Sequence, residues 1–355
     1  MGRPTIADIA RRAGVSKGAV SFALNGRPGV SEATRERILR VAEEMNWRPH
    51  HAARALGGAR SDAVGLVIAR PARTIGVEPF FSHLLSGLQA VLSASSVALH
   101  LMVVEDTAAE IEVYRRWASE HRVDGFVVVD LQVRDPRLPV LDELGLPAVV
   151  LGGPGKGGNQ LRIWADDREA MLSIVDYLAA IGHRRIAHLA GLPHFQHTQR
   201  RIRALRDASR RLGLEEAVSV PTDFSDAEGA AATRTLLSRA GRPTAIVYDS
   251  DVMAVAGLGV AGEMGVAVPG ELSIVSFDDS VLARIVHPPL TALSRDTFAL
   301  GEQVARSLLE AVEGAGPGRD LQMPTPRLTV RESTSPPSPV GVVAARFVDT
   351  GSEPV

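Results

Sequence analysis

The chain has 355 residues, of which 45% are hydrophobic and 23% charged, a composition typical of a globular protein with ample material for a core. This length favours two or three domains. The chain has no cysteine, which excludes disulfides, thiolate metal sites and cysteine nucleophiles. No stretch reaches the roughly eighteen apolar residues of a membrane span, and the N-terminus lacks a signal-peptide pattern, so we expect a cytoplasmic protein.

The net charge of -2 conceals an asymmetry between the two ends of the chain. Residues 1–60 contain eleven lysines and arginines but five acidic residues, whereas the remaining 295 residues contain 28 basic and 36 acidic residues. A basic head on an acidic body is the distribution expected when the head alone meets nucleic acid.

The head carries the pattern of three short helices. Thr5 begins the first helix with a capping box, and Gly14 ends it. Ser16 caps a second helix over residues 17–24, and a third spans residues 32–45. Two short helices joined by a tight turn predict a helix-turn-helix, whose second helix enters the major groove of DNA. The alternative is a helical bundle without a DNA role, which would leave an aromatic and a basic side chain facing outward for no purpose.

A near-contiguous motif in the head identifies the family that it resembles. It comprises residues 5–16 (TIADIARRAGVS), Val20-Ser21, Leu24-Asn25, Val30-Ser31, Thr34-Arg35, and the run from Trp47 to Leu56. Over about fifty residues it resembles the N-terminal signature of the lac repressor (LacI/GalR) family. The resemblance implies a sequence-specific DNA-binding transcription regulator, a repressor, with a helix-turn-helix domain over residues 1–48 and a hinge and linker over residues 49–60.

The resemblance also assigns DNA contacts to particular residues. Lys17, Gly18 and Phe22 match the positions that read base edges. A lysine suits guanine, and a phenylalanine can pack on a thymine methyl group. Gly18 and Phe22 depart from the family's more usual polar readers, which leaves the operator sequence open. The other predicted DNA contacts, of which the first three match phosphate-contacting positions, are Ser16, Ser21, Asn25, Thr5 and Ala53.

Residues 50–56 resemble the family's hinge helix, which folds on operator DNA and inserts a leucine, here Leu56, into the minor groove. Such an apolar wedge bends DNA at a cost on the order of a few kcal/mol per base step. His50 stands where the family commonly has asparagine. The alternative is a plain linker, which Gly57 and Gly58 favour. A hinge that orders on DNA would be a linker without DNA and a helix when bound to it.

From residue 61 onward, apolar runs alternate with amphipathic stretches of helix length. The predicted strands are residues 64–69, 98–104, 125–129, 148–151, 186–190, 245–248 and 272–276. The predicted helices are residues 81–92, 110–120, 170–181, 201–212, 228–239 and 252–264. This alternation predicts parallel, doubly wound α/β sheets, and the number of units predicts two lobes with a ligand cleft at the carboxyl ends of the strands.

Further landmarks extend the resemblance to residue 335. They are Val123-Asp124-Gly125, the run from Gly182 to Ile186, Asp251-x-Met253-Ala254, Val268-Pro269, and the run from Ser276 to Asp279. The resemblance implies that residues 61–335 form a periplasmic-binding-protein-like effector domain, which dimerises and binds a small molecule. Its implied partners are a palindromic DNA operator, a small-molecule effector and a second copy of the chain. Residues 336–355 are expected to be a tail of little structure, without the leucine heptads of a tetramerising coiled coil.

Two residues are central to the predicted ligand site. Arg201 matches the family's hydroxyl-binding arginine, and Asp278, directly after an apolar run, matches its acidic ligand. We expect them to face each other across the cleft. An arginine, a carboxylate and a stacking ring are the chemistry of sugar recognition, so the effector is predicted to be a sugar. Gly152 replaces an acid of some sugar-binding relatives, which leaves the sugar open. The other predicted ligand contacts are Phe80, Phe81, Phe224 and Ser250.

The sequence gives no support for catalysis, a metal or a cofactor. Residues 257–262 read G-x-G-x-x-G, but they begin nine residues after the preceding strand, inside a helical pattern. The histidines between residues 188 and 197 lack a carboxylate or thiolate at ligand spacing, and His183 is expected to be structural. We therefore expect no enzyme. The alternatives to a regulator are a sugar-binding protein of transport and an α/β enzyme, neither of which explains the head.

Overall fold

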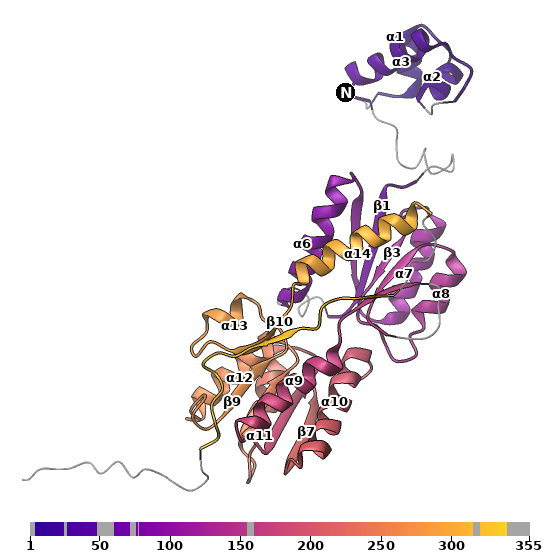
Figure 1. Cartoon of the computed structure of the whole chain (residues 1–355). Coiled ribbons are helices and arrows are strands. Elements are labelled where there is room, and N and C mark those ends of the chain that lie inside the picture. The colour runs from indigo at the N-terminus through magenta and orange to yellow at the C-terminus, as the bar shows by residue number, and fades with distance from the viewer. Residues whose placement is uncertain are drawn as a thin grey trace, which may run out of the picture.

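The computed structural model describes residues 4–24, 27–47, 60–71, 76, 78–154, 160–314 and 320–338. Three helices form an N-terminal unit, and two sheets flanked by helices form the rest (Figure 1). Within these ranges, no helix is both long and apolar enough to cross a membrane.

The N-terminal unit confirms the three predicted helices, which are α1 (Ile6–Ala13), α2 (Lys17–Leu24) and α3 (Glu32–Glu44). At the start of α1, the backbone N–H and the hydroxyl of Thr5 both donate to the Asp8 carboxylate. Gly14 ends the helix with a left-handed φ of 66°, which suits glycine. The core shared by the three helices includes Ile9, Val20 and Ile38, each fully buried.

Two six-stranded sheets each form the centre of a lobe, as predicted. The strands of lobe 1 are β1 (Ala63–Ala69), β2 (Ala98–Val104), β3 (Phe126–Val128), β4 (Ala148–Leu151), β5 (Leu161–Trp164) and β11 (Leu321–Gln322). The strands of lobe 2 are β6 (Arg185–Ala190), β7 (Glu216–Pro221), β8 (Ala245–Tyr248), β9 (Ser273–Ser276), β10 (Thr291–Ser294) and β12 (Arg327–Thr329). Their spatial orders are β11-β5-β4-β3-β1-β2 and β12-β10-β9-β8-β6-β7. The pairing is parallel except for β12, which runs antiparallel to β10.

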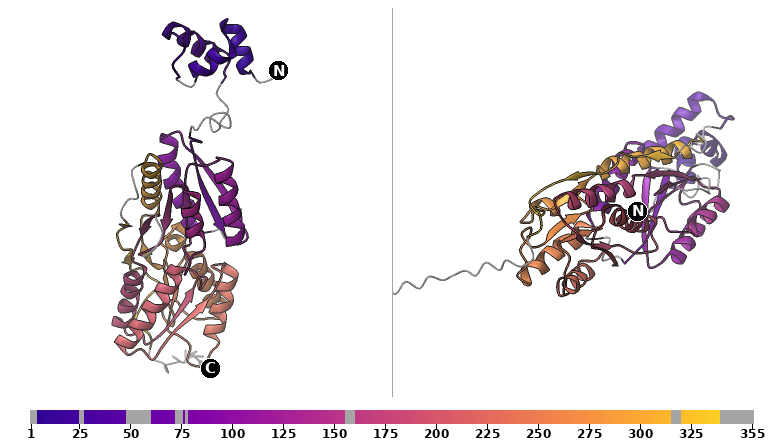
Figure 2. Two further views of the ribbon diagram at one scale, coloured as in Figure 1. Left: turned by 90° about the vertical axis from the view of Figure 1, so that its right-hand side faces the viewer. Right: turned by 60° about the horizontal axis from the view of Figure 1, so that its bottom comes forward.

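Helices cover both sheets. Lobe 1 carries α6 (Pro79–Ala94), α7 (Thr107–Ser119), α8 (Arg137–Leu144) and α14 (Thr297–Val312). Lobe 2 carries α9 (Asp167–Ala180), α10 (Gln196–Leu212), α11 (Asp226–Leu237), α12 (Asp251–Glu263) and α13 (Val281–Ile285). Between the lobes the chain crosses three times, from β5 to α9, from β10 to α14, and from β11 to β12 (Figure 2). Each lobe is therefore built from separate stretches of sequence.

Helix α14 belongs to lobe 1 although it lies near the C-terminal end of the sequence. It packs directly along α6 (Figure 1). The two helices approach each other through Gly87 and Gly301, which face one another. A Cβ atom at Gly87 would lie 2.0 Å from the carbonyl oxygen of Phe298, so this close contact requires glycine.

The seven predicted strands are confirmed to within one residue at each end, and the six predicted helices each begin one to five residues earlier than expected. The difference has a physical cause. A helix begins at its polar cap, such as Asp106 or Asp166, whereas the apolar pattern starts with the first inward side chain. The predictions missed five strands, β5, β7, β10, β11 and β12, which are short or partly exposed.

The C-terminal segment continues along lobe 2 beyond the expected end of the domain at residue 335. The hydroxyl of Ser338 donates to the carbonyl of Gly270, with 2.6 Å between the oxygens. His183 holds the same segment, because its Nε2 lies 3.0 Å from the carbonyl oxygen of Ser335. Its Nδ1 lies 2.8 Å from the Thr244 hydroxyl. This histidine is structural, as expected. Most of the expected tail, residues 339–355, lies outside the described residues.

Candidate functional site

The outward face of α2 carries the residues predicted to read bases. Lys17 and Gly18, in its first turn, are exposed, and Phe22 is 41% exposed one turn later. Val20 and Ala23 lie on the opposite face, buried in the core of the N-terminal unit. The helix therefore presents a basic and an aromatic side chain to the solvent, as its spacing predicted.

The remaining predicted DNA contacts are placed less uniformly. Ser16 is exposed, and its hydroxyl accepts a hydrogen bond from the backbone N–H of Ala19, so it also caps α2. Thr5 is exposed at the start of α1, and Ser21 is half-buried. Three further predicted contacts, in the turn after α2 and in the hinge, lie outside the described residues, and they are Asn25, Ala53 and Leu56.

A cavity of about 500 Å³ lies between the lobes, where strands of both sheets end. From lobe 1 it is lined by Arg70, Glu78, Phe80, Asp130 and Leu151. From lobe 2 it is lined by Asp167, His197, Arg201, Phe224, Asp249, Ser250 and Asp278. The crossing segments and the strand ends beside them add Trp164, Arg295, Asp296, Met323 and Arg327.

The structure brings five of the six predicted ligand residues to this cavity, namely Phe80, Arg201, Phe224, Ser250 and Asp278. Phe81 is placed differently, because it is 1% exposed and packs in the core of lobe 1. Phe80 and Phe81 are consecutive residues of α6, and consecutive side chains of a helix point about 100° apart. One of the two can face the cavity, and the other then faces the sheet.

The expectation that Arg201 and Asp278 face each other across the cleft is wrong. Arg201 lies on α10, after β6, and Asp278 follows β9. Both strands belong to the sheet of lobe 2, so both side chains come from the same wall. The opposite wall presents Arg70, directly after β1, and Asp130, two residues after β3. The signal that identified Asp278, a charged residue directly after an apolar strand, applies equally to these two.

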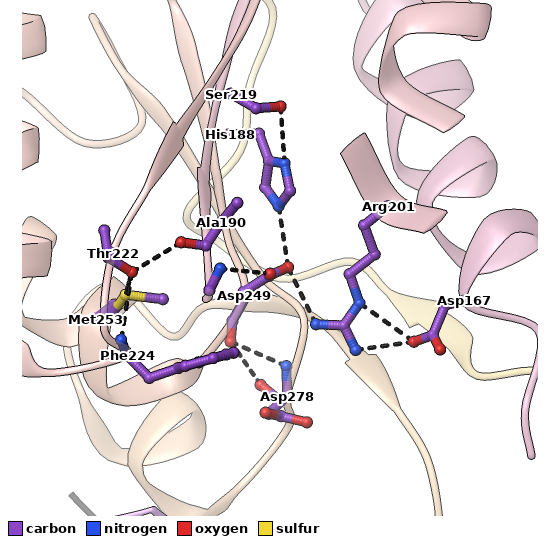
Figure 3. Close-up of polar contacts among 12 residues, drawn as sticks. Asp167, His188, Ala190, Arg201, Ser219, Thr222, Phe224, Asp249, Met253 and Asp278 are labelled. Atoms are coloured by element: carbon purple, nitrogen blue, oxygen red, sulfur yellow. Dashed lines mark hydrogen bonds and ion pairs between the residues drawn. The ribbon is translucent and has the colours of Figure 1, made fainter. Parts of the chain in front are cut away.

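In lobe 2, Arg201 is fixed between two carboxylates (Figure 3). Its Nη2 lies 2.8 Å from Asp167 Oδ1, and its Nη1 lies 3.0 Å from Asp249 Oδ1. Its guanidinium carbon lies 3.6 Å from the centre of the Phe277 ring. Arg201 is 4% exposed, and its guanidinium is bound by the two carboxylates and stacks on the Phe277 ring.

Asp249 follows β8 and joins this arginine to the sheet (Figure 3). Its carboxylate also accepts from the backbone N–H of Gly191, at 2.8 Å, and lies 2.9 Å from His188 Nε2. His188 in turn reaches the Ser219 hydroxyl. Burial raises the pKa of Asp249, but Arg201, His188 and the Gly191 amide outweigh burial and hold that pKa well below its usual range.

In lobe 1, Arg70 is also held between two carboxylates. Its Nε lies 2.7 Å from Asp130 Oδ2, and its Nη1 lies 2.9 Å from Glu78 Oε1. Burial raises the pKa of Glu78 to about 7, although Arg70 acts in the opposite direction. The Arg70 guanidinium also lies over two rings of lobe 2, 4.5 Å from the centre of Phe224 and 5.0 Å from that of Phe195. Arg70 therefore connects the two lobes.

The remaining predicted ligand residues already have partners within the protein. Phe224, at a φ of 70°, packs so closely on Gly191 that a Cβ atom there would lie 1.7 Å from the ring. Arg70 covers this ring as well, so a stacked ligand would have to displace its guanidinium. The hydroxyl of Ser250 caps α12 by accepting from the N–H of Met253. These positions line the cavity, and their contact with a ligand stays a prediction.

The glycines of the G-x-G-x-x-G sequence lie within α12, as the helical pattern predicted. Gly257 packs against Tyr248, whose hydroxyl oxygen would lie 2.1 Å from a Cβ atom at that position. Close packing explains this glycine without a nucleotide. In the part of the chain that the structure describes, no group of three histidine or acidic side chains is arranged to hold a metal ion.

Comparison with known families defines the class of this protein. Residues 5–50 match the profile of the family described as "Bacterial regulatory proteins, lacI family". Residues 175–334 match the profile of the "Periplasmic binding protein-like domain". A helix-turn-helix followed by a two-lobed domain of this kind defines a DNA-binding transcriptional regulator.

The chain is also similar to individual regulators over most of its length. It is 33% identical to the HTH-type transcriptional regulator CelR of Thermobifida fusca over 316 residues, 88% of this chain and 93% of that one. A solved structure of a transcriptional regulator CelR–cellobiose complex is 32% identical, covers 93% of this chain and 100% of its own, and has a TM-score of 0.70. A LacI family regulator of Bifidobacterium animalis subsp. lactis is 32% identical with a TM-score of 0.72, over 79% of this chain and 100% of its own. The chain belongs to the lacI family of bacterial regulatory proteins.

Proposed function

We propose that this regulator is a homodimeric repressor whose affinity for a palindromic operator is set by a sugar bound between the lobes. The observation that carries the proposal is the composition of the cavity. Arginine and carboxylate side chains line it beside the ring of Trp164 and the ring of Phe80, over which Arg295 lies at 5.2 Å. Charged groups that bind hydroxyls, next to apolar faces, suit the alternating polar and apolar surfaces of a sugar.

Two further observations support a sugar as the ligand. The cavity volume lies within the range of pockets that enclose a small molecule. In addition, one of the similar solved structures is a complex of a transcriptional regulator CelR with cellobiose. Asp278 is the residue we assign to a ligand hydroxyl, because its side chain is 20% exposed and forms an ion pair with Arg295 at the cavity.

Exposed apolar side chains on both lobes support a dimer. In lobe 1, Leu101 and Val103 are 45% and 37% exposed on β2, at the edge of the sheet. In lobe 2, Val281 and Ile285 are 53% and 70% exposed on α13. A second copy would cover such surfaces. A twofold dimer would present two α2 helices to inverted half-sites, which is why the operator is proposed to be palindromic.

The test is selection of bound sequences from random DNA by the full chain. We expect inverted repeats, with an affinity that falls linearly with salt concentration on logarithmic scales. Lys17→Ala should weaken binding to the selected site by about 1–3 kcal/mol relative to random DNA, because it removes a base contact. Direct repeats, or no enriched sequence, would contradict the proposal.

The hinge has its own test. We expect Leu56→Ala to weaken binding to the selected site by about 1–3 kcal/mol and to leave binding to random DNA nearly unchanged, because the wedge acts on bent operator DNA. Equal losses on both DNAs would show that Leu56 belongs to a plain linker.

The proposal includes no catalytic step, and it places the protein in the cytoplasm, where bacterial operators lie. A sugar recovered unchanged after prolonged incubation with the protein, as judged by chromatography, would support a binding role. Turnover of the sugar would instead favour an enzyme.

A further inference from the structure

The charges that line the cavity are unequal. Six side chains carry carboxylates, and they are Glu78, Asp130, Asp167, Asp249, Asp278 and Asp296. Four carry guanidinium groups, and they are Arg70, Arg201, Arg295 and Arg327. Burial raises the pKa of Glu78 to about 7, so this group is only partly ionised at neutral pH, but the other five carboxylates still outnumber the four guanidinium groups. The pairing between the two sets decides what charge a ligand meets.

The arginines inside the cavity are already engaged. Arg70 and Arg201, each 4% exposed, each hold two carboxylates, and Arg295 holds Asp278. An arginine binds a phosphate through the same paired N–H groups that bind a carboxylate. A phosphate could thus reach Arg70 or Arg201 only by displacing a buried carboxylate, which would then lack its partner.

The exposed charges at the rim do not change this balance. Arg327 and Asp296 both line the opening and are both exposed. Their opposite charges are screened by solvent, so the rim offers weak attraction to an anion.

Most of the helix N-termini at the cavity also disfavour an anion. A helix N-terminus attracts phosphate unless a negative side chain occupies it. Three helices that begin at the cavity carry such an acid in their first turn or cap, namely Asp167 of α9, Asp251 of α12 and Asp296 of α14. A fourth, α6, carries Glu78 at its cap, which is partly ionised at neutral pH. A fifth helix, α10, has no acid in its first turn, so its N-terminus does not oppose an anion. Its His197 adds no positive charge at neutral pH, because burial and Arg201 lower the pKa of this histidine to about 4.

We infer that the cavity selects an uncharged saccharide and rejects its phosphorylated counterpart. This inference rests on the proposed sugar-controlled function and specifies the ligand class. The reactions that supply such a ligand are hydrolysis of glycosidic bonds and uptake without phosphorylation.

The experiment is calorimetric titration of the full chain at one ionic strength. The probes are glucose, cellobiose, maltose, trehalose and sucrose, and the 6-phosphate of each. We expect at least one neutral sugar to bind, and its 6-phosphate to bind about tenfold more weakly or worse, because the phosphate meets acidic groups. A 6-phosphate that binds as tightly as its parent would overturn the inference and leave the proposed function standing. Binding of none of the ten would overturn both.

A pair of variants tests the cause. Asp278→Asn leaves Arg295 without its carboxylate. The affinity for the neutral sugar divided by the affinity for its 6-phosphate should therefore fall several-fold. The matched control, Asp176→Asn, removes an acid that pairs with Arg211 on the outer surface of lobe 2, and should keep the wild-type ratio. Because a ratio is measured, a folding defect affects both affinities alike. An unchanged ratio in Asp278→Asn, or equal narrowing in both variants, would overturn the inference.

Discussion

The two walls of the cavity hold an arginine in the same way but support it differently. In lobe 2, Arg201 lies on a ring of its own lobe, and its partner Asp249 is further bound by His188 and a backbone amide. In lobe 1, Arg70 lies on rings of the opposite lobe, and burial raises the pKa of its partner Glu78 to about 7. The wall of lobe 2 is therefore a fixed frame, whereas the wall of lobe 1 depends on the position of the lobes and on pH.

The largest expected effect is a difference in the free energy of unfolding between a substitution in the wall of lobe 2 and one in the wall of lobe 1. Asp249→Ala should lower the free energy of unfolding by about 3–5 kcal/mol, because it leaves Arg201 buried with one partner fewer. Glu78→Gln should lower it by less than about 1 kcal/mol, since a neutral amide can still accept from Arg70. Urea unfolding at pH 7 measures both. Asp176→Asn, in an exposed pair, is the control for charge removal, with an expected effect under about 1 kcal/mol. Similar losses from Asp249→Ala and Glu78→Gln would contradict the difference between the walls.

A second effect concerns ligand response. Asp278→Asn should weaken sugar binding by about 1–3 kcal/mol and leave operator affinity without sugar unchanged, because its carboxylate is partly exposed and supports no second buried group. Arg201→Ala should instead lower stability as well, because it strands Asp167 and Asp249. Calorimetry, operator binding and urea unfolding distinguish the two variants. Loss of operator binding by folded Asp278→Asn without sugar would show that Asp278 supports the structure of the lobe.

The third effect, the smallest at any one pH step, is the pH dependence that Glu78 of lobe 1 contributes. Since the pKa of Glu78 is raised from 4.5 to about 7, the folded state keeps a proton that the unfolded state loses above pH 4.5. The stability that this proton contributes is full below pH 4.5 and is lost as the pH rises through 7. The stability of the wild type relative to Glu78→Gln should therefore fall between pH 5 and 7, by at most about 1.4 kcal/mol per pH unit. A constant difference over that range would show that Glu78 is ionised throughout.

The head was largely predictable because its function depends on one contiguous segment. The exposure of Lys17 and Phe22 and the burial of Val20 follow from helical spacing alone. The strands and lobes were predictable for a similar reason, since each apolar run is a local pattern.

The walls of the cavity were less predictable because they depend on pairing between distant residues. Spacing along the chain does not reveal that Arg201 meets Asp249, because that contact follows from β8 lying beside β6 in the sheet. The assignment of Arg201 and Asp278 to opposite walls was wrong because it required the three crossings between the lobes. Those crossings are flanked by strands that the apolar pattern missed. Phe81 was misplaced because it lies one residue after Phe80, and so about 100° around α6, on the face that packs against the sheet.

The most direct measurement of ligand control is operator affinity with and without a bound sugar. A labelled operator from the DNA selection is titrated with the full chain, and binding is followed by fluorescence anisotropy. The titration is done without sugar and again with a neutral sugar at a concentration that calorimetry shows to be saturating. We expect the Kd for the operator to change by about 5-fold to 150-fold, the range of typical coupling between sites, and the Kd for random DNA to stay the same. Asp278→Asn should require more sugar for the same change. An operator Kd that stays constant while calorimetry shows the cavity occupied would contradict control of DNA binding by this site.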